Sequence, residues 1–265
     1  MKIVTSASDL PHGCAFVPTM GALHSGHQSL FALAAQKSQS VLASIFVNPL
    51  QFENSDDLAK YPRTPERDAQ LAEESGVTHL WLPQHEEIYP PGFTKLSAGP
   101  LGEMYEGASR PGHFDGVVTV VSRLFELARP RCAIFGEKDF QQLSLIRKIE
   151  SDVEIIGAPT IRESDGLALS SRNARLDSDA RARATVIARA LYAAVAAPDH
   201  GSARLAMREI ISTEPAFTLD YAHVIDEENF SDATEATVHA RAIIAGWLNG
   251  IRLIDNMAMK PRGQR

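Results

Sequence analysis

Short apolar runs alternate with stretches of helical periodicity through the first 160 residues of this 265-residue chain. The run at 41–47 is nearly continuous and rich in β-branched residues, as expected of a strand that is covered on both faces. Comparable runs lie at 15–18, 79–82, 131–135 and 153–156. Strands separated by helices of this length predict a parallel sheet with right-handed crossovers. In such a sheet, ligands bind beyond the carboxyl ends of the strands.

The remainder of the chain has a different pattern. Residues 178–197 are an alanine-rich helical stretch, and 203–212 is a second one. Apolar runs follow at 219–225, 238–248 and 251–254, and Asn249-Gly250 is typical of a type I′ hairpin turn. We therefore predict an α/β protein with a Rossmann-like parallel-sheet domain over 1–160 and a smaller α+β domain over 161–265.

Composition and charge exclude several classes of protein. The formal net charge of −7 argues against a general nucleic-acid binder, because such proteins usually carry a basic face. No apolar stretch approaches the ~20 residues of a membrane helix, and the N-terminus lacks the apolar core of a signal peptide. Cys14 and Cys132 lie in apolar runs, which indicates buried thiols in a reducing compartment. We expect a cytoplasmic protein with no nucleic-acid or membrane partner.

The first of the long strand-like runs ends in the loop at 18–27, Pro-Thr-Met-Gly-Ala-Leu-His-Ser-Gly-His, where a helix begins. A helix start presents unpaired N–H groups and a partial positive charge, which suits a phosphate. Gly26 lets the backbone approach a ligand, and His24 and His27 can donate hydrogen bonds to phosphate oxygens. The alternative is a turn with two surface histidines. The tetrapeptide alone supports both equally, and its strand–loop–helix setting favours phosphate.

Polar residues also follow two other strands, where a parallel-sheet site would lie. Asn48 and Gln51 come just after the run at 41–47 and could orient a polar ligand, although from this segment alone turn chemistry at Asn-Pro is the favoured explanation. Gly136 permits a sharp exit from a later strand, and Lys138 could meet phosphate charge. The alternative for Lys138 is a solvated charged loop.

A third polar segment lies at the junction of the two predicted domains. Ser170, Ser171 and Arg172 offer two hydroxyls and a guanidinium, which together suit a polyphosphate. A polar linker is the alternative. Asp165-Gly166, just upstream, predicts a turn and therefore a mobile flap.

Two residues near helix starts have less certain roles. His113 either faces the site or caps a helix, and the sequence supports both equally. Asp68 could contact Mg²⁺ through water, but a solvated helix face explains it better.

Together these segments resemble the pantoate–β-alanine ligase (AMP-forming) family, and the His-x-Gly-His loop resembles the nucleotidyltransferase superfamily. Matching blocks lie in family order at 18–27, 44–52, 61–64, 136–142 and 162–173, with shorter matches at 220–221 and 253–256. Gln28, Arg67 and Arg123 depart from the residues usual in that family. Arg67 leaves Asp68 as the one carboxylate there and weakens the metal assignment.

The resemblance implies an ATP-dependent condensation of pantoate with β-alanine. Pantoate attacks the α-phosphate of ATP, giving pantoyl adenylate and pyrophosphate, and the amine of β-alanine then displaces AMP. A carboxylate nucleophile with a pKa near ~4 is already ionised at neutral pH. The first step therefore needs alignment and cationic groups, with no general base and no covalent enzyme intermediate. The resemblance also implies a carbon–nitrogen ligase that uses ATP and Mg²⁺ and forms a homodimer.

The resemblance also assigns roles to individual residues. His24, His27, Lys138 and Arg172 would be catalytic, with His27 a candidate proton donor. Gln51, Gln142 and Asn48 would bind pantoate, and Asp68 is the candidate metal ligand. The residues expected around ATP are Met20, Gly21, Ala22, Leu23, His24, Ser25, Gly26, His27, Gly136, Glu137, Lys138, Asp139, Ile161, Leu169, Ser170, Ser171 and Arg172.

Two other functions share part of this pattern. A nucleotidyltransferase that transfers AMP to a phosphate acceptor would have the same loop but would need no amine. A non-catalytic nucleotide sensor would bind ATP and release no pyrophosphate with any acid. Pyrophosphate exchange with pantoate alone, followed by AMP release only when β-alanine is added, separates the three functions.

Overall fold

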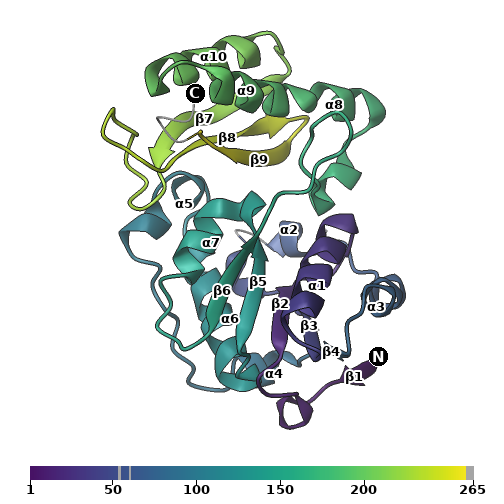
Figure 1. The fold of residues 1–265 in the computed structure, drawn as a ribbon. Helices are drawn as coiled ribbons and strands as arrows, with labels where there is room; N and C mark the ends of the chain where they lie inside the picture. Colours follow the sequence, from purple (N-terminus) through teal and green to yellow (C-terminus); the bar gives the residue numbers. More distant parts are fainter. Residues whose placement is uncertain (53–54, 60, 261–265) are drawn as a thin grey trace. The chain divides into compact units, whose positions relative to one another are not determined.

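The computed structural model describes residues 1–52, 55–59 and 61–260. Its contacts divide the chain into two units, Met1–Pro159 and Thr160–Arg265 (Figure 1). The first unit contains the parallel sheet and the second contains an antiparallel sheet, as the two sequence patterns predict.

The sheet of the first unit has six strands in the order β1-β4-β3-β2-β5-β6, and all its pairs are parallel. The strands are β1 (Lys2–Val4), β2 (Ala15–Thr19), β3 (Val41–Ile45), β4 (His79–Trp81), β5 (Cys132–Gly136) and β6 (Glu154–Ala158). β1 is a short edge strand that the sequence patterns did not predict, and it pairs with β4 alone. Three residues with two of them exposed give too little apolar signal to be recognised.

Four helices connect the strands of this sheet. They are α1 (Ser25–Lys37), α3 (Pro65–Glu74), α6 (His113–Ala128) and α7 (Phe140–Ile146). α1 and α3 lead the chain from β2 through β3 to β4, whereas α6 and α7 lead it back to β5 and on to β6. Because crossovers are right-handed, the two pairs of helices cover opposite faces. The order reverses between β2 and β5, so the carboxyl ends of these two strands open a crevice for a ligand.

Shorter helical segments lie in the loops of both units. They are η1 (Ala7–Asp9), η2 (Pro49–Gln51), α2 (Ser55–Ala59), α4 (His85–Ile88), η3 (Pro100–Glu103), α5 (Glu106–Ser109), η4 (Glu137–Asp139) and η5 (Ser171–Arg175). Of these, η2 follows β3 and η4 follows β5, so both lie at the carboxyl edge of the sheet.

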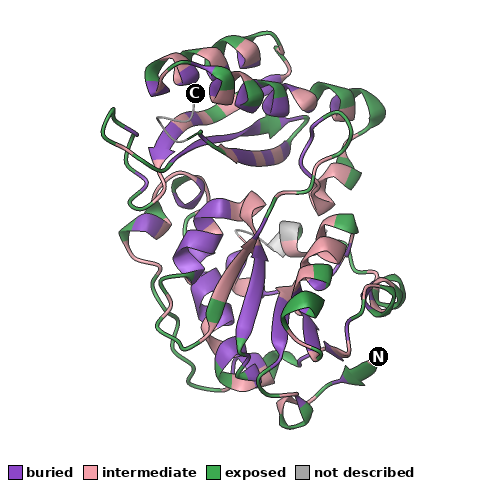
Figure 2. Cartoon of the chain, in the orientation of Figure 1, coloured by how far each residue is buried: buried purple, intermediate pink, exposed green. Residues whose placement is uncertain are grey.

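The central strands β2, β3 and β5 are largely buried on both faces, whereas the edge strands β1 and β6 have exposed residues (Figure 2). Val17, Ala43 and Leu80 pack with Phe31 of α1 and Ala72 of α3 in one cluster. Cys14 and Cys132 are buried free thiols, as predicted, and burial raises the pKa of the Cys14 thiol to about 11. Neither cysteine is therefore placed to act as a nucleophile at neutral pH.

The second unit packs helices against three antiparallel strands in the order β7-β8-β9. Its elements are α8 (Ser178–Arg183), α9 (Thr185–Ala196), α10 (His200–Ser212), β7 (Phe217–Asp226), β8 (Ala240–Leu248) and β9 (Ile251–Ala258). The single helix predicted over 178–197 is divided at Ala184, where the hydroxyl of Thr185 donates to the carbonyl of Ala182. Asn249 and Gly250 both have positive φ, as a type I′ turn requires. Among the described residues, the longest apolar helix is too short to cross a bilayer.

Gly246 of β8 gives a prediction for stability. A Cβ at this position would lie 2.4 Å from the ring of Phe217 and 2.5 Å from the carbonyl oxygen of Thr218. We expect Gly246→Ala to lower the free energy of unfolding by about 1–3 kcal/mol, because the core cannot accommodate the methyl group without a shift. Gly136→Ala is the control, since its Cβ would meet no heavy atom within 4 Å. Equal urea midpoints for the two variants would contradict the prediction.

Candidate active site

The candidate site lies where the order of the parallel strands reverses. β2 and β5 are neighbours, with Ala15 opposite Cys132 and Phe16 opposite Ala133. The loop before α1 leaves the carboxyl end of β2, and η4 leaves the carboxyl end of β5. The topology therefore brings the His-x-Gly-His loop and the Lys138 segment, which are more than a hundred residues apart, to one edge of the sheet.

Two imidazoles cap the start of α1. His24 is the N-cap residue, and its Nδ1 accepts a hydrogen bond from the N–H of Gly26 at 3.1 Å. The Nδ1 of His27 accepts from the N–H of His24 at 3.3 Å, which closes a reciprocal capping box. An Nδ1 that accepts from an N–H carries no proton, so each neutral ring is protonated at Nε2. Helix capping therefore gives both rings the same tautomer, with an Nε2–H available as a donor.

Burial keeps both rings neutral. Burial, and secondarily the neighbouring His24, lower the pKa of His27 to about 3, while Asp139 opposes them. Burial and then the positive charge of Lys138 lower the pKa of His24, while Asp139 opposes them. The ligand-free protein therefore presents two uncharged hydrogen-bond donors beside one ammonium group. His27 is the predicted proton donor. To act as an imidazolium it would first have to be protonated, and its pKa lies far below neutrality.

Lys138 and Asp139 stand directly after β5. The Nζ of Lys138 lies 3.5 Å from Oδ1 of Asp139, and the lysine side chain is largely buried. Lys138 lies close enough to His24 for its positive charge to lower the pKa of that ring. The arrangement is suited to a polyanion that approaches the N-terminus of α1.

Asp68 is not on a solvated helix face, so that interpretation was wrong. The residue lies in the first turn of α3 and is 1% exposed. Its carboxylate accepts hydrogen bonds from the N–H groups of Ala22 and Leu23, at 2.9 and 2.8 Å, and from the hydroxyl of Thr64 at 3.0 Å. No group of three His, Cys, Asp or Glu residues that could hold a metal occurs in the described part of the chain. The structure gives Asp68 a role in holding the loop, and a metal ligand there stays a prediction.

Asn48 and Gln51 form one buried unit after β3. The amide of Asn48 donates to Oε1 of Gln51 and to the carbonyl of Gly116, both at 3.0 Å, and accepts from the hydroxyl of Tyr89 at 2.7 Å. The same Oδ1 accepts from the N–H of Leu50, so the turn chemistry is present as well. Asn48 has no exposed surface, whereas Gln51 keeps 8%. Asn48 therefore fixes the orientation of the Gln51 amide.

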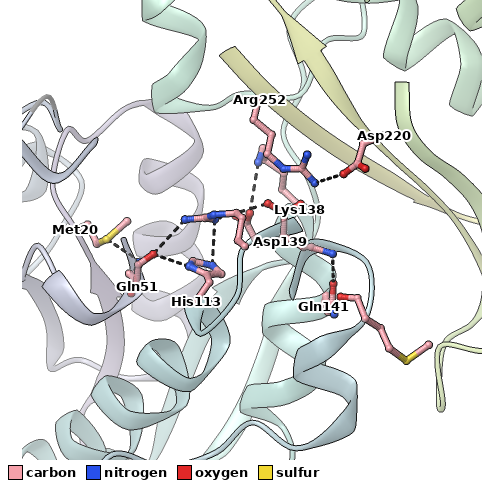
Figure 3. A network of polar contacts seen from close by, with 11 residues as sticks. Met20, Gln51, His113, Lys138, Asp139, Gln141, Asp220 and Arg252 are labelled. Carbon is pink, nitrogen blue, oxygen red and sulfur yellow. Dashed lines mark hydrogen bonds and ion pairs between the residues drawn. The ribbon is translucent and has the colours of Figure 1, made fainter. Parts of the chain in front are cut away.

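The start of α6 holds the backbone of the same turn. Nδ1 of His113 lies 2.8 Å from the carbonyl oxygen of Gln51, and Nη2 of Arg110 donates to that oxygen at 3.2 Å (Figure 3). Nη1 of Arg110 lies 3.2 Å from Nε2 of His113, which fits an imidazole protonated at Nδ1. His113 therefore contacts the turn that carries Gln51, and the cap position is Gly112.

Sequence reasoning missed contacts around this turn that involve Gly116 and Met20. A Cβ at Gly116 would lie 2.4 Å from the carbonyl oxygen of Leu50, so only glycine allows α6 to approach so closely. Nε2 of Gln51 lies 2.9 Å from the sulfur of Met20, which links the turn after β3 to the loop after β2 (Figure 3). Such contacts join residues far apart in the chain and leave no local periodicity that could have revealed them.

The two glutamines of α7 have different surroundings. Gln141 is buried, and its amide donates to the carbonyls of Leu101 and Met104 and accepts from the N–H of Glu106. Gln142 is partly exposed. The side chain of Gln141 thus orders the preceding loop, which leaves Gln142 as the glutamine that could contact a ligand.

In the second unit, the predicted turn at Asp165-Gly166 is present in a short hairpin. Gly166 has φ +89°, and Arg162 pairs with Ala168. Arg162 binds both carboxylate oxygens of Asp255, at 2.6 and 3.0 Å. Arg181 binds both oxygens of Asp165 and thereby lowers its pKa. Ion pairs therefore fasten both the base and the tip of the predicted flap.

The hydroxyl groups predicted to meet a polyphosphate follow this hairpin. Oγ of Ser170 accepts from the N–H of Arg172 at 3.3 Å and caps η5. The amide of Asn173 donates to the carbonyl of Ala168. Ser170, Ser171 and Arg172 remain partly exposed, as a ligand-binding role requires.

Comparison with known proteins finds one family. The family model described as pantoate-beta-alanine ligase matches residues 2–258. A pantothenate synthetase of Thermus thermophilus is 45% identical over 98% of this chain and all of its own length, and one of Acidothermus cellulolyticus is 46% identical over 93% of this chain and 85% of its own length.

Two solved structures are similar over nearly the whole chain. A crystal structure of the Thermus thermophilus pantothenate synthetase has a TM-score of 0.94 at 43% identity, covering 98% of this chain and 100% of that one. A pantoate-beta-alanine ligase of Francisella tularensis, crystallised with β-γ ATP and β-alanine, has a TM-score of 0.80 at 34% identity, covering 97% of each chain.

The imidazole assignments can be tested by NMR in the ligand-free protein. We expect the ¹⁵N shifts of His24 and His27 to show Nδ1 unprotonated and Nε2 protonated. His27 should stay neutral until the pH approaches about 3. Because the unfolded chain binds that proton near the ordinary value of 6.5, stability should fall as the pH is lowered through this window. His27→Gln assigns the signal, and a ring that titrates near 6.5 would contradict the prediction.

Proposed function

The chain belongs to the pantoate–beta-alanine ligase family. From that premise we propose which part of the reaction is performed by each residue at the carboxyl ends of β2 and β5, where the strand order reverses. The enzyme is a carbon–nitrogen ligase that condenses pantoate with β-alanine in an ATP-dependent reaction, through pantoyl adenylate. The observation that carries the assignment of residues is the meeting of His24, His27 and Lys138 at the carboxyl ends of β2 and β5.

The phosphates of ATP bind at the start of α1. The helix N-terminus and the Nε2–H groups of His24 and His27 supply uncharged donors, and Lys138 supplies the positive charge. Residues Met20–His27 and Gly136–Asp139 surround the nucleotide, partly through their backbone. As the carboxylate of pantoate attacks the α-phosphorus, the bond to pyrophosphate breaks, and these preorganised groups stabilise the growing charge on the leaving oxygens.

Pantoate is held by the polar side chains beyond β3 and β5. Gln51 and Gln142 orient its hydroxyl groups and its carboxylate, while Asn48 fixes the amide of Gln51. The turn that carries Gln51 is held by α6 through His113 and Gly116, so the side-chain amide of Gln51 has little freedom. Alignment of an ionised nucleophile with the phosphorus can account for a large part of the rate.

The resemblance to the family also assigns nucleotide-binding roles to residues of the second unit. We assign Ser170, Ser171 and Arg172 to the phosphates, and Ile161 and Leu169 to the rest of the nucleotide. In the second half-reaction the amine nitrogen of β-alanine forms a bond to the acyl carbon, and the acyl–oxygen bond to AMP breaks with its electron pair on the phosphate. We assign Lys138, and from the family resemblance Arg172, to the charge of the leaving AMP.

We propose that Mg²⁺ enters the site bound to the phosphates of ATP. The donor set on the described residues does not form a dedicated site, and Asp68 already accepts three hydrogen bonds. Mg²⁺ commonly reaches such sites on the phosphates of the nucleotide, where it neutralises their charge.

We further propose that the protein is cytoplasmic, which the free buried thiols support. We also propose that it is a homodimer, which the family supports and which light scattering of the purified protein tests.

Lys138→Ala tests the assignment of the positive charge. Loss of one preorganised group typically raises a barrier by roughly 3–4 kcal/mol, so single-turnover adenylation should slow by a factor on the order of 10² or more. Lys148→Ala, an exposed lysine of the same unit, is the control and should keep the rate of the unmodified enzyme. Unchanged adenylation in folded Lys138→Ala would refute the role.

The pH dependence of adenylation tests whether the histidines act as uncharged donors. Because both pKa values are lowered, deprotonation of an imidazolium cannot limit the rate above neutrality. The kcat/KM for ATP, which reports the pKa values of the free enzyme, should therefore change little between about pH 6.5 and 8. A tenfold fall in kcat/KM per pH unit above about 6.5 would instead indicate that a protonated imidazole is required.

Mass spectrometry of the products tests the function itself. The complete mixture of ATP, Mg²⁺, pantoate and β-alanine should yield pantothenate, AMP and pyrophosphate. Omission of β-alanine should leave pyrophosphate exchange intact and stop AMP release. Release of AMP to a phosphate acceptor, or ATP binding without any pyrophosphate, would indicate the nucleotidyltransferase or the sensor instead.

A further inference from the structure

We propose that Asp68 and Thr64 are positioning residues for adenylation, because together they fix the loop that carries both imidazoles. The proposal rests on the proposed function for its kinetic consequence, while its structural consequence can be measured without substrate. It concerns the N-cap residue and the first turn of α3.

The contact joins the first turn of α3 to the loop before α1. Oδ2 of Asp68 accepts from the N–H of Ala22 at 2.9 Å, and Oδ1 accepts from the N–H of Leu23 at 2.8 Å. These two residues directly precede His24. A carboxylate of which 1% is exposed therefore engages two consecutive backbone donors, one with each oxygen. Burial of a charged group is tolerated when it is hydrogen-bonded in this way.

The loop needs such support because its backbone is strained. Ala22 has φ +52°, a left-handed conformation that is unfavourable for a residue with a Cβ. Strain of this kind persists only where the surroundings impose it. The N–H of Ala22 itself is one of the two groups that Asp68 holds. Gly21 has φ +82°, and a Cβ there would lie 3.0 Å from Oδ2 of Asp68.

Thr64 is committed to the same carboxylate. It occupies the N-cap position of α3, where a threonine hydroxyl usually accepts a helix N–H, yet no such side-chain bond is made. Its Oγ1 instead donates to Oδ1 of Asp68 at 3.0 Å. α3 therefore starts without a side-chain cap, and the hydroxyl of Thr64 instead donates to the carboxylate of Asp68, which holds the loop before α1.

The position of this loop sets the direction of the imidazoles. Leu23 is 3% exposed in the core and is followed at once by His24. The N–H of His24 donates to Nδ1 of His27, and the Nδ1 of His24 accepts from the N–H of Gly26. The backbone of this loop therefore fixes the orientation of both rings. A displacement of about 1 Å in a catalytic group can cost on the order of 10²-fold in rate.

Asp68→Asn tests the proposal with a side chain of the same shape. An amide oxygen can accept only one of the two loop N–H groups and turns its NH₂ against the other. We expect kcat for adenylation to fall by about 10²-fold, with a much smaller change in the KM for ATP. We also expect the ¹⁵N signals of His24 and His27 to move in the ligand-free protein. Glu66→Gln, the same change at an exposed position of the same turn, should leave both unchanged.

Thr64 provides the second pair of variants, in which the carboxylate is kept. Thr64→Val should lower kcat by roughly 5–10-fold, corresponding to one lost hydrogen bond, and Thr64→Ser should restore it. These variants keep the proposal testable if Asp68→Asn does not fold. Wild-type kcat and imidazole signals in both Asp68→Asn and Thr64→Val would overturn it.

A titration with Mg²⁺ separates the positioning role from metal binding. The Mg²⁺ concentration for half-maximal adenylation should be the same in Asp68→Asn and in the unmodified enzyme. A large increase in that concentration, with unmoved imidazole signals, would make Asp68 a metal ligand and overturn the proposal. If the unmodified enzyme forms no pantoyl adenylate, the proposed function fails, but the NMR comparison still decides whether Asp68 fixes the loop.

Discussion

The reversal of strand order between β2 and β5 is the constraint on which the candidate site depends. Both strands are buried, so their places in the sheet are set by core packing and by parallel pairing. The chain leaves their carboxyl ends toward helices on opposite faces, and a crevice opens between the two loops. His24 comes from one loop and Lys138 from the other. No local preference of either segment would bring them together.

Charge is distributed unevenly within this crevice. Two imidazoles remain neutral because they are buried and because one of them lies near an ammonium group. Their tautomers follow from helix capping, since each Nδ1 accepts a backbone N–H. The result is a set of fixed dipoles together with one cation, Lys138, from the loop after β5. This arrangement suits a triphosphate better than a cluster of mobile charges would, because fixed groups need little reorganisation as charge develops in the reaction.

Two buried polar side chains support the loops of the site. Asn48 lies behind Gln51, and Asp68 lies behind Ala22 and Leu23. A buried polar group is costly unless its hydrogen bonds are made, so each of these side chains stabilises one loop conformation over others. The family resemblance makes Asn48 a candidate ligand of pantoate and Asp68 a candidate metal ligand, and both assignments stay predictions. A sequence block records that a position matters to a site, but it does not distinguish a group that touches the substrate from one that holds its neighbour.

The order of apolar runs and helical patterns was sufficient to predict the parallel sheet, the antiparallel second unit and the hairpin at Asn249-Gly250, because periodicity and turn chemistry are local. The position of His24 and His27 at a helix start and the burial of the two cysteines were predictable for the same reason. The short edge strand β1, the close approach of Gly116 to the turn at Leu50, and the partners of Asp68 and His113 were not. Each of these depends on atoms that are distant in the chain and meet only once the sheet and its helices have packed. Local pattern therefore determined which elements form, and tertiary packing alone decided which polar groups face one another at the switch point.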